Sequence, residues 1–254
     1  MYVLELAGHD DAFAACEAES AATGVELLGA GLATARAVTD CLDALAFTRR
    51  ASALVGTTDP SVESAAALLR TAGVDRAGSV AVRAVDVRGT TGVDTQRVER
   101  ALGDLLVDRG FRVDLDDPDH ELRALFAGPP GSDGNPDERG DETPDDGEVA
   151  VDPDSRVCAL GWLTRAVEHS FGERRPSDRP FFQPGSMDPI LARALVNVAG
   201  ARPGATLLDP MCGTGGLLLE GALVGARVVG VDAQAKMAAG TRRNLRGLDR
   251  KSVV

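Results

Sequence analysis

An acid and a glycine-rich turn occur together in the run Asp209-Pro210-Met211-Cys212-Gly213-Thr214-Gly215-Gly216. Glycines let a backbone turn tightly and approach a ligand, and a helix that starts there points free N–H groups at that ligand. Asp232 stands nineteen residues after Gly213, directly behind the apolar run 228–231. A carboxylate at the end of a second strand can accept hydrogen bonds from both hydroxyls of a ribose. The spacing therefore predicts a site for a nucleotide-containing ligand.

Two such ligands have different requirements. A dinucleotide turn needs a third glycine in the pattern G-x-G-x-x-G, and Leu218 occupies that position here. S-adenosylmethionine instead suits an acid that closes the first strand, near the ammonium group of the donor's amino acid, and Asp209 lies four residues before Gly213. We therefore favour S-adenosylmethionine over a dinucleotide, and over a glycine turn that binds nothing.

The residues on either side of this run predict the elements that position it. Strand, glycine turn, helix and strand follow one another, which is a βαβ unit and implies a parallel sheet. Asp188 and Pro189 indicate a helix start, because Asp caps a helix N-terminus and Pro suits the first helical position. We expect strands at 206–208 and 227–231, and helices at 189–199, 215–224 and 235–246.

The part of the chain before residue 128 mixes helical and strand patterns, and predicts two small α+β units. We expect helices at 10–23, 39–50, 62–71 and 95–109, strands at 2–6, 25–28, 31–34, 79–87, 113–115, 121–126 and 156–162, and a helix at 163–171. Residues 128–154 combine Pro, Gly and a series of acids. Such a segment cannot bury apolar surface, so we expect a solvated insertion.

Charge divides the chain at about residue 156. Residues 1–156 hold 31 acidic and 14 basic side chains, and residues 157–254 hold 8 and 13, so the parts carry net charges of −17 and +5. This asymmetry indicates separate modules with different partners. Lysine occurs only as Lys236 and Lys251. An acidic chain that uses arginine in place of lysine and has few aromatic residues suits hydration in concentrated salt. This composition predicts a protein from a halophile.

Composition also excludes several classes of protein. No apolar run approaches the roughly 20 residues of a membrane helix, and the N-terminus lacks the basic start and apolar stretch of a secretory signal. The four cysteines are far apart, without a CxxC pair, which argues against a zinc site or a disulfide framework. We therefore expect a cytoplasmic chain with reduced thiols that binds neither a membrane nor a metal.

The run RPFFQPGSMDPILARALVNVAG at 179–200, followed by LLDPMCGTGG at 207–216 and VVGVD at 228–232, resembles the archaeal tRNA (guanine(10)-N2)-dimethyltransferases. The resemblance covers the whole chain in order and implies three domains. These are a ferredoxin-like unit at 1–48, a THUMP RNA-binding domain at 49–165 with the acidic insertion 128–154, and the start of a Rossmann-like methyltransferase domain at 166–254. GFRVDLDDPD at 110–119 carries the THUMP assignment. The implied fold is an α+β first part followed by an incomplete α/β domain.

The resemblance also implies an activity and a set of site residues. The activity is S-adenosylmethionine-dependent methylation of the exocyclic N2 of a guanine in tRNA, at position 10. The cofactor-binding residues would be Asp209, Cys212, Gly213, Thr214, Gly215, Gly216 and Asp232, with Phe182, Pro184 and Ser186 from the segment that closes over the donor. Arginine suits phosphate contacts, and the candidates for RNA binding are Arg83, Arg88, Arg97, Arg100, Arg174, Arg175 and Arg179. We expect tRNA as the partner and a monomer.

One feature of the family is missing from the sequence. Such enzymes use an (Asp/Asn)-Pro-Pro-Tyr element after the fourth strand, where the polar groups hold the target amine and the ring stacks on an extruded guanine. No such tetrad occurs in these 254 residues. We therefore expect a C-terminally truncated chain, inactive by itself, whose catalytic residues lie beyond its C-terminus. Residues 249–254 can be encoded by GAT-CGG-AAG-AGC-GTC-GTG, which reads like a common sequencing adapter.

Three other functions remain open at this point. The chain could be an RNA- and donor-binding module without activity, or a methyltransferase for another guanine N2 in RNA. A nicotinamide-dependent oxidoreductase is the third, and binding of NAD would favour it.

Overall fold

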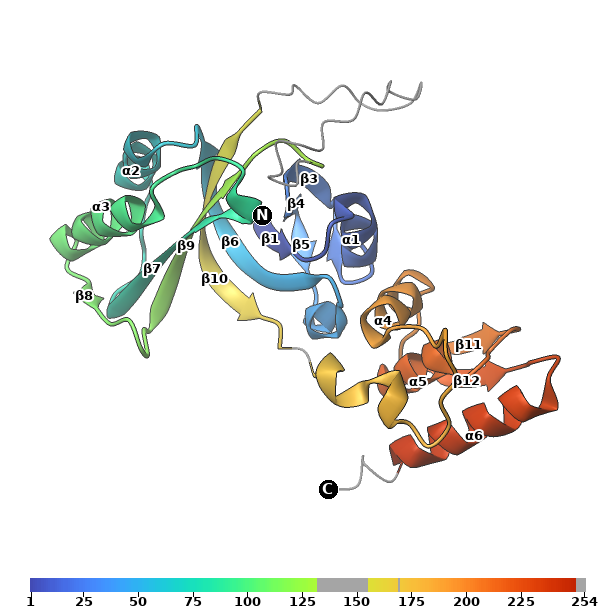
Figure 1. The fold of residues 1–254 in the computed structure, drawn as a ribbon. Coiled ribbons are helices and arrows are strands. Elements are labelled where there is room, and N and C mark those ends of the chain that lie inside the picture. The colour runs from blue at the N-terminus through green and yellow to red at the C-terminus, as the bar shows by residue number, and fades with distance from the viewer. Residues whose placement is uncertain (132–154, 169, 250–254) are drawn as a thin grey trace, which may run out of the picture. The chain divides into compact units, whose positions relative to one another are not determined.

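The structure, a computed structural model, describes residues 1–131, 155–168 and 170–249 (Figure 1). The chain forms two compact units. The first unit consists of Met1–Ala15, Thr23–Val38 and Thr48–Ala166, and the second of Cys16–Ala22, Thr39–Phe47 and Val167–Val254. Apart from residues 128–131, the predicted acidic insertion lies outside the described residues, and so do the last five residues of the chain.

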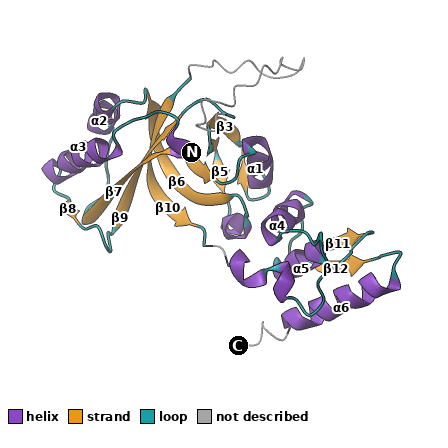
Figure 2. Cartoon of the chain, in the orientation of Figure 1, coloured by secondary structure: helices purple, strands orange, loops and turns teal. Residues whose placement is uncertain are grey.

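One eight-stranded sheet, ordered β3-β4-β1-β6-β10-β9-β7-β8, organises the first unit. Neighbouring strands are antiparallel except for β7, which is parallel to both β8 and β9 (Figure 2). The strands are β1 (Tyr2–Leu6), β3 (Glu26–Gly29), β4 (Leu32–Ala35), β6 (Thr48–Thr58), β7 (Ser79–Asp86), β8 (Arg112–Val113), β9 (His120–Ala127) and β10 (Val157–Ala166). Two short strands, β2 (Ala22–Thr23) and β5 (Ala37–Val38), pair with each other in a separate two-stranded sheet.

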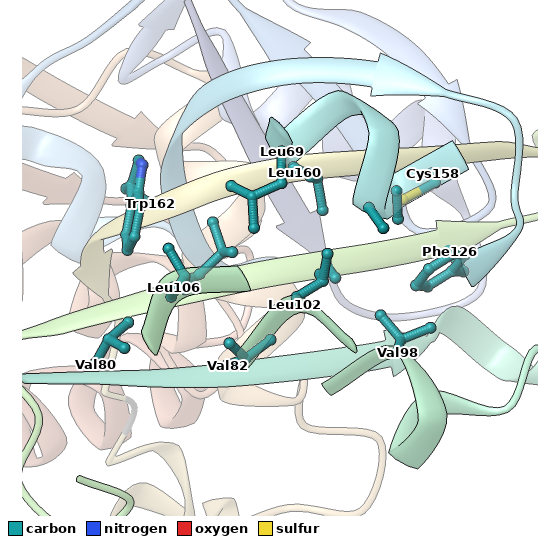
Figure 3. Close-up of a cluster of buried hydrophobic side chains, with 14 of the residues drawn as sticks. Leu69, Val80, Val82, Val98, Leu102, Leu106, Phe126, Cys158, Leu160 and Trp162 are labelled. Atoms are coloured by element: carbon teal, nitrogen blue, oxygen red, sulfur yellow. The ribbon is translucent and has the colours of Figure 1, made fainter. Parts of the chain in front are cut away.

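Helices α2 (Val62–Thr71) and α3 (Thr95–Asp108) pack on this sheet through the apolar core shown in Figure 3. Both begin as capping rules require, because Ser61 Oγ accepts from the amide of Ser64 at 3.0 Å and Asp94 Oδ1 from that of Arg97 at 3.0 Å. The predicted apolar face of 95–109 is buried. The labelled core residues are Leu69, Val80, Val82, Val98, Leu102, Leu106, Phe126, Cys158, Leu160 and Trp162.

Two predicted helices are wrong. Residues 39–50 form the 3-10 helix η1 (Asp40–Ala44) and then enter β6 at Thr48. The apolar spacing there is used as predicted, since Leu42 and Leu45 are both buried, but β6 lies between β1 and β10, and sheet pairing decides its conformation. The predicted helix 163–171 is also wrong at its start, because β10 continues to Ala166 beside Arg50 of β6.

The first unit also includes the start of helix α1 (Asp11–Ala18) and the 3-10 turn η2 (Val87–Gly89). Two ion pairs link residues that are far apart in the sequence. Arg88 Nη2 lies 2.6 Å from Asp11 Oδ1, and Arg123 Nη2 lies 2.7 Å from Glu5 Oε2. Arg123 and Asp11 are both buried, so each charge has the close partner that a desolvated ion requires.

The second unit contains the predicted βαβ arrangement, and its elements confirm the expected order. Strands β11 (Thr206–Asp209) and β12 (Arg227–Gly230) are parallel, with Asp209 opposite Gly230 at their ends. The helical elements are η3 (Phe171–Arg174), η4 (Pro176–Asp178), α4 (Pro189–Val198), α5 (Gly216–Leu223) and α6 (Ala235–Asp249). As predicted, Asp188 caps α4, accepting from the amide of Ile190 at 2.8 Å, with Pro189 as the first helical residue.

Within the described residues, no helix is both long and apolar enough to span a membrane. No three His, Cys, Asp or Glu side chains in that part of the chain gather into a group that could hold a metal ion.

Replacing Leu102 by Ala should destabilise the first unit by about 2–5 kcal/mol, because Leu102 is fully buried and the substitution leaves a cavity. Cys158 belongs to the same core, and burial raises the pKa of its thiol to about 12. Alkylation of Cys158, followed by mass spectrometry, should therefore be slow in the wild-type chain and faster in Leu102→Ala. Val107→Ala, on the exposed side of α3, is the matched control. Equal alkylation rates in all three proteins would contradict this account of the core.

Candidate functional site

The glycine-rich run forms the loop between β11 and α5, at the carboxyl end of the parallel strands. The amide of Val231 donates to the carbonyl of Asp209 and that of Cys212 to the carbonyl of Val231, both at 2.9 Å. Gly213 and Gly215 have φ angles of +50° and +83°, which favour glycine. A Cβ on Gly215 would also lie 2.7 Å from Cγ2 of Thr241. The loop therefore requires glycine at 215 for two separate reasons.

The two predicted acids lie at the ends of adjacent strands and order the backbone around them. Asp232 accepts from the amide of Gly213 through Oδ2 at 2.9 Å and from that of Gln234 through Oδ1 at 2.8 Å. Asp209 accepts from the amide of Met211 at 3.0 Å. An ionised carboxylate has about four acceptor positions. Both acids therefore keep acceptor capacity for the polar groups of a ligand.

Two polar side chains of α6 hold the loop from the side of its carbonyl groups. The Thr241 hydroxyl donates to the carbonyl of Gly213 at 2.7 Å, and the Asn244 amide donates to the carbonyl of Thr214 at 2.9 Å. Asn244 also joins Phe181, donating to its carbonyl and accepting from its amide, both at 2.8 Å. Both side chains are buried. The sequence prediction missed them, although a Thr and an Asn three residues apart on a helix share one face.

The segment before α4 covers part of the loop. The Thr214 hydroxyl donates to Ser186 Oγ at 3.0 Å, and the Ser186 hydroxyl donates to the carbonyl of Gln183 at 2.6 Å. Between this segment and the loop lies a cleft of about 360 Å³. Seven of the predicted cofactor residues line it: Asp209, Cys212, Gly213, Thr214, Gly216, Pro184 and Ser186.

The other three predicted cofactor residues do not line the cleft. Gly215 and Asp232 act on the loop backbone as described, and Phe182 is 45% exposed. The cleft instead includes residues that the sequence did not indicate. Among these, Met211 is 83% exposed. The remaining unpredicted residues are Gln183, Gly185, Met187, Leu217 and Met237.

The predicted RNA-binding arginines of the first unit differ in the exposure and the partners of their side chains. Arg83 donates to the carbonyl of Leu115 at 2.6 Å, and Arg88 is held by Asp11 with only 15% of its side chain exposed. Arg97 pairs with Glu63 at 3.0 Å, where both side chains are well exposed. The fourth candidate, Arg100, is exposed on α3.

The three candidates of the second unit lie close together in one segment. Arg174 Nε donates to Glu220 Oε1 at 3.1 Å, and Arg179 Nη2 donates to the carbonyl of Arg174 at 3.3 Å. Arg175 is exposed. Glu220, whose side chain is 1% exposed, also pairs with Arg193 Nη2 at 2.7 Å. The carboxylate therefore fixes two guanidinium groups.

Comparison with known proteins identifies the domain that contains this site. Residues 176–254 match the family model of the RMKL-like methyltransferase domain. The tRNA (guanine(10)-N2)-dimethyltransferase of Methanothermobacter thermautotrophicus is 37% identical over 164 residues, which are 64% of this chain and 41% of the relative. The enzyme of the same name from Methanocaldococcus jannaschii is 32% identical over 176 residues, 68% of this chain and 43% of the relative. The chain thus spans about two fifths of the length of these curated relatives.

A solved structure supports the fold. The crystal structure of TrmN from Thermus thermophilus aligns with 97% of this chain and 69% of its own, with a TM-score of 0.51 and 21% sequence identity. The two share an α/β fold.

Residues 176–254 of the second unit are thus similar to the RMKL-like methyltransferase domain. The curated homologues of the chain are tRNA (guanine(10)-N2)-dimethyltransferases, so the predicted resemblance to these enzymes is confirmed. Methyltransferase relatives also agree with S-adenosylmethionine as the expected donor. The ferredoxin-like and THUMP assignments and the individual site residues stay predictions.

Replacing Asn244 by Ala should leave three backbone groups, two of Phe181 and one of Thr214, without their partner. Each buried unsatisfied group costs about 1–3 kcal/mol, so the free energy of unfolding of the second unit should fall by at least that amount. Chemical denaturation followed by circular dichroism measures the effect. Arg242→Ala, an exposed change on the same helix, should leave the midpoint unchanged. A wild-type midpoint for Asn244→Ala would show that the loop does not depend on this amide.

Proposed function

We propose that this chain is part of an S-adenosylmethionine-dependent tRNA methyltransferase that modifies the exocyclic N2 of a guanine, at position 10 by similarity to its relatives. The observation that carries the proposal is the cleft over the glycine loop, with acids at the ends of two adjacent parallel strands, in a domain of the RMKL-like methyltransferase family. Ligands of open α/β sheets bind at such strand ends.

The donor's chemical groups match groups of the cleft and of the loop backbone beside it. Asp209 would bind the ammonium group, Asp232 the ribose hydroxyls, and the amides at the start of α5 the carboxylate, since helix N-termini favour anions. Cys212, Gly213, Thr214, Gly215 and Gly216 would shape the floor, while Phe182, Pro184 and Ser186 would close the site. The contact of Asp232 with the amide of Gly213 ties this acid to the loop.

Methyl transfer forms a bond from N2 to the methyl carbon while the bond from that carbon to sulfur breaks, and the amine loses a proton. The guanine amine is a weak nucleophile, so catalysis depends mainly on holding the two reactants in line. The described residues would contribute the donor side of this arrangement by fixing the sulfonium and excluding water from it.

The domain proposal follows the same division. We assign 1–48 to a ferredoxin-like unit, 49–165 to a THUMP domain and 166–254 to the methyltransferase domain. The last boundary is supported by the compact units, which divide between Ala166 and Val167. We propose tRNA as the partner of a monomeric cytoplasmic protein. Its RNA contacts would be drawn from Arg83, Arg88, Arg97, Arg100, Arg174, Arg175 and Arg179.

Asp232→Ala should weaken donor binding by about 5- to 150-fold, because hydroxyls buried without an acceptor cost about 1–3 kcal/mol. Isothermal titration calorimetry with S-adenosylmethionine and S-adenosylhomocysteine measures this, with Glu168→Ala, an exposed acid of the same unit, as the control. Asp232→Asn, which keeps one acceptor oxygen, should give an intermediate loss. Unchanged affinity in Asp232→Ala would place the donor elsewhere, and tight binding of NAD would favour an oxidoreductase instead.

Incubation with labelled donor and an unmodified tRNA transcript tests the reaction. Any label that is transferred should appear as N2-methylguanosine or N2,N2-dimethylguanosine after digestion to nucleosides. Label in another nucleoside would contradict the proposed target atom. Donor and tRNA binding without transfer would favour the alternative of an RNA- and donor-binding segment.

A further inference from the structure

A second recess of the second unit, also about 360 Å³, shares no lining residue with the donor cleft. One wall is the segment 173–180, which contributes Arg174, Arg175 and Arg179. Helices α5 and α6 form the rest, with residues that include Glu220 and Gly247. Three arginines thus face one recess in a chain whose net charge is −12.

The charges beneath this recess are only partly balanced. The buried Glu220 carboxylate forms ion pairs with Arg174 and Arg193. Arg179 Nη1 is buried without a hydrogen-bond partner in the described part of the chain. Burial lowers the pKa of Arg179, and the opposing effect of Glu220 does not cancel it. A desolvated cation without a full partner is unfavourable, so an anion in the recess would stabilise it.

Accessible cations lie next to this buried one. Arg175 on the recess wall and Arg243 and Arg246 on α6 are exposed, and none of their guanidinium groups has a hydrogen bond or ion pair among the described residues. Arg243 does not line the recess itself, but it lies one helical turn before Gly247, which does. Many arginines of the first unit, in contrast, are engaged by acids, as Arg88 is by Asp11. Arginines that are exposed and unpaired are available to an external anion.

The chemistry of the recess favours a phosphate of a nucleic acid backbone. Guanidinium groups match phosphate oxygens in charge and geometry, and are among the groups that bind the backbone of a nucleic acid. Two exposed acids, Glu173 and Asp178, also line the recess and weaken its attraction for a single free anion. A polyanion that reaches Arg175 and Arg243 together gains from several contacts at once, and so overcomes these acids.

We infer that this recess binds the phosphate backbone of the RNA substrate, with Arg175 and Arg243 as direct contacts and Arg179 as the uncompensated charge behind them. The inference rests on the proposed function, since it takes tRNA as the partner. It assigns backbone binding to the second unit itself, on a surface separate from the donor cleft.

Fluorescence anisotropy of an unmodified tRNA transcript with the full chain, over a series of salt concentrations, tests this inference. The slope of log K against log salt concentration is negative, and each backbone contact adds roughly 0.7–0.9 to its magnitude. Arg175→Gln and Arg243→Gln should each lower this magnitude by about that amount and weaken binding several-fold at low salt. Arg227→Gln, an exposed arginine on β12, should bind like the wild type.

Glu173→Gln provides a change of the opposite sign. It removes a rim acid, so tRNA should bind more tightly, which a folding defect cannot imitate. Donor affinity should be the same in all variants.

Three outcomes would overturn the inference. If the wild type binds tRNA but Arg175→Gln and Arg243→Gln keep its slope and affinity, the backbone binds elsewhere and the proposed function stands. If the wild type binds no tRNA at any salt concentration, both this inference and tRNA as the partner fail. If inorganic phosphate binds the wild type and not Arg175→Gln, yet tRNA binding is unaffected by the substitution, the recess is a site for a small anion.

Discussion

The buried amide of Asn244 is the interaction on which the site depends. It joins three parts of the second unit: helix α6, the carbonyl of Thr214 in the glycine loop, and the backbone of Phe181 in the segment before α4. Thr241, one helical turn earlier, holds the carbonyl of Gly213. Because α6 donates hydrogen bonds to both carbonyls, the loop keeps its conformation, in which Gly213 and Gly215 have positive φ angles.

Two different kinds of interaction hold the loop and the elements around it. Asp232 fixes the turn by accepting from the amide of Gly213, which links the second strand to the first turn of the loop. The buried Glu220 of α5 fixes Arg174 in the segment 171–180 and Arg193 of α4. Such a pair is costly to bury and strongly destabilising to break. Hydrogen bonds thus fix the loop beside the cleft. An ionic cluster around Glu220 fixes Arg174 and Arg193.

Charge is distributed differently in the two units for a structural reason. In the first unit, Arg88 and Arg123 serve the fold, since each is paired with an acid from β1 or α1. In the second unit, Arg175 and Arg243 are exposed without partners among the described residues. A net charge summed along the sequence does not distinguish these two uses of arginine. Exposed arginines such as Arg175 and Arg243 are available to an external anion, whereas Arg88 and Arg123 are held by acids of the fold.

The sequence by itself determined the local features. The loop from Asp209 to Gly216, the βαβ order and the cap at Asp188 depend on neighbouring residues, so their spacing was sufficient to predict them. Tertiary structure decided the rest. Residues 39–50 carry a helical pattern, yet pairing with β1 and β10 makes Thr48 the start of a strand. Arg88 reads as a surface cation, yet Asp11, 77 residues away, holds it. Residues so far apart in the sequence come into contact only when the elements that carry them pack together. The spacing of residues along the chain does not reveal that packing.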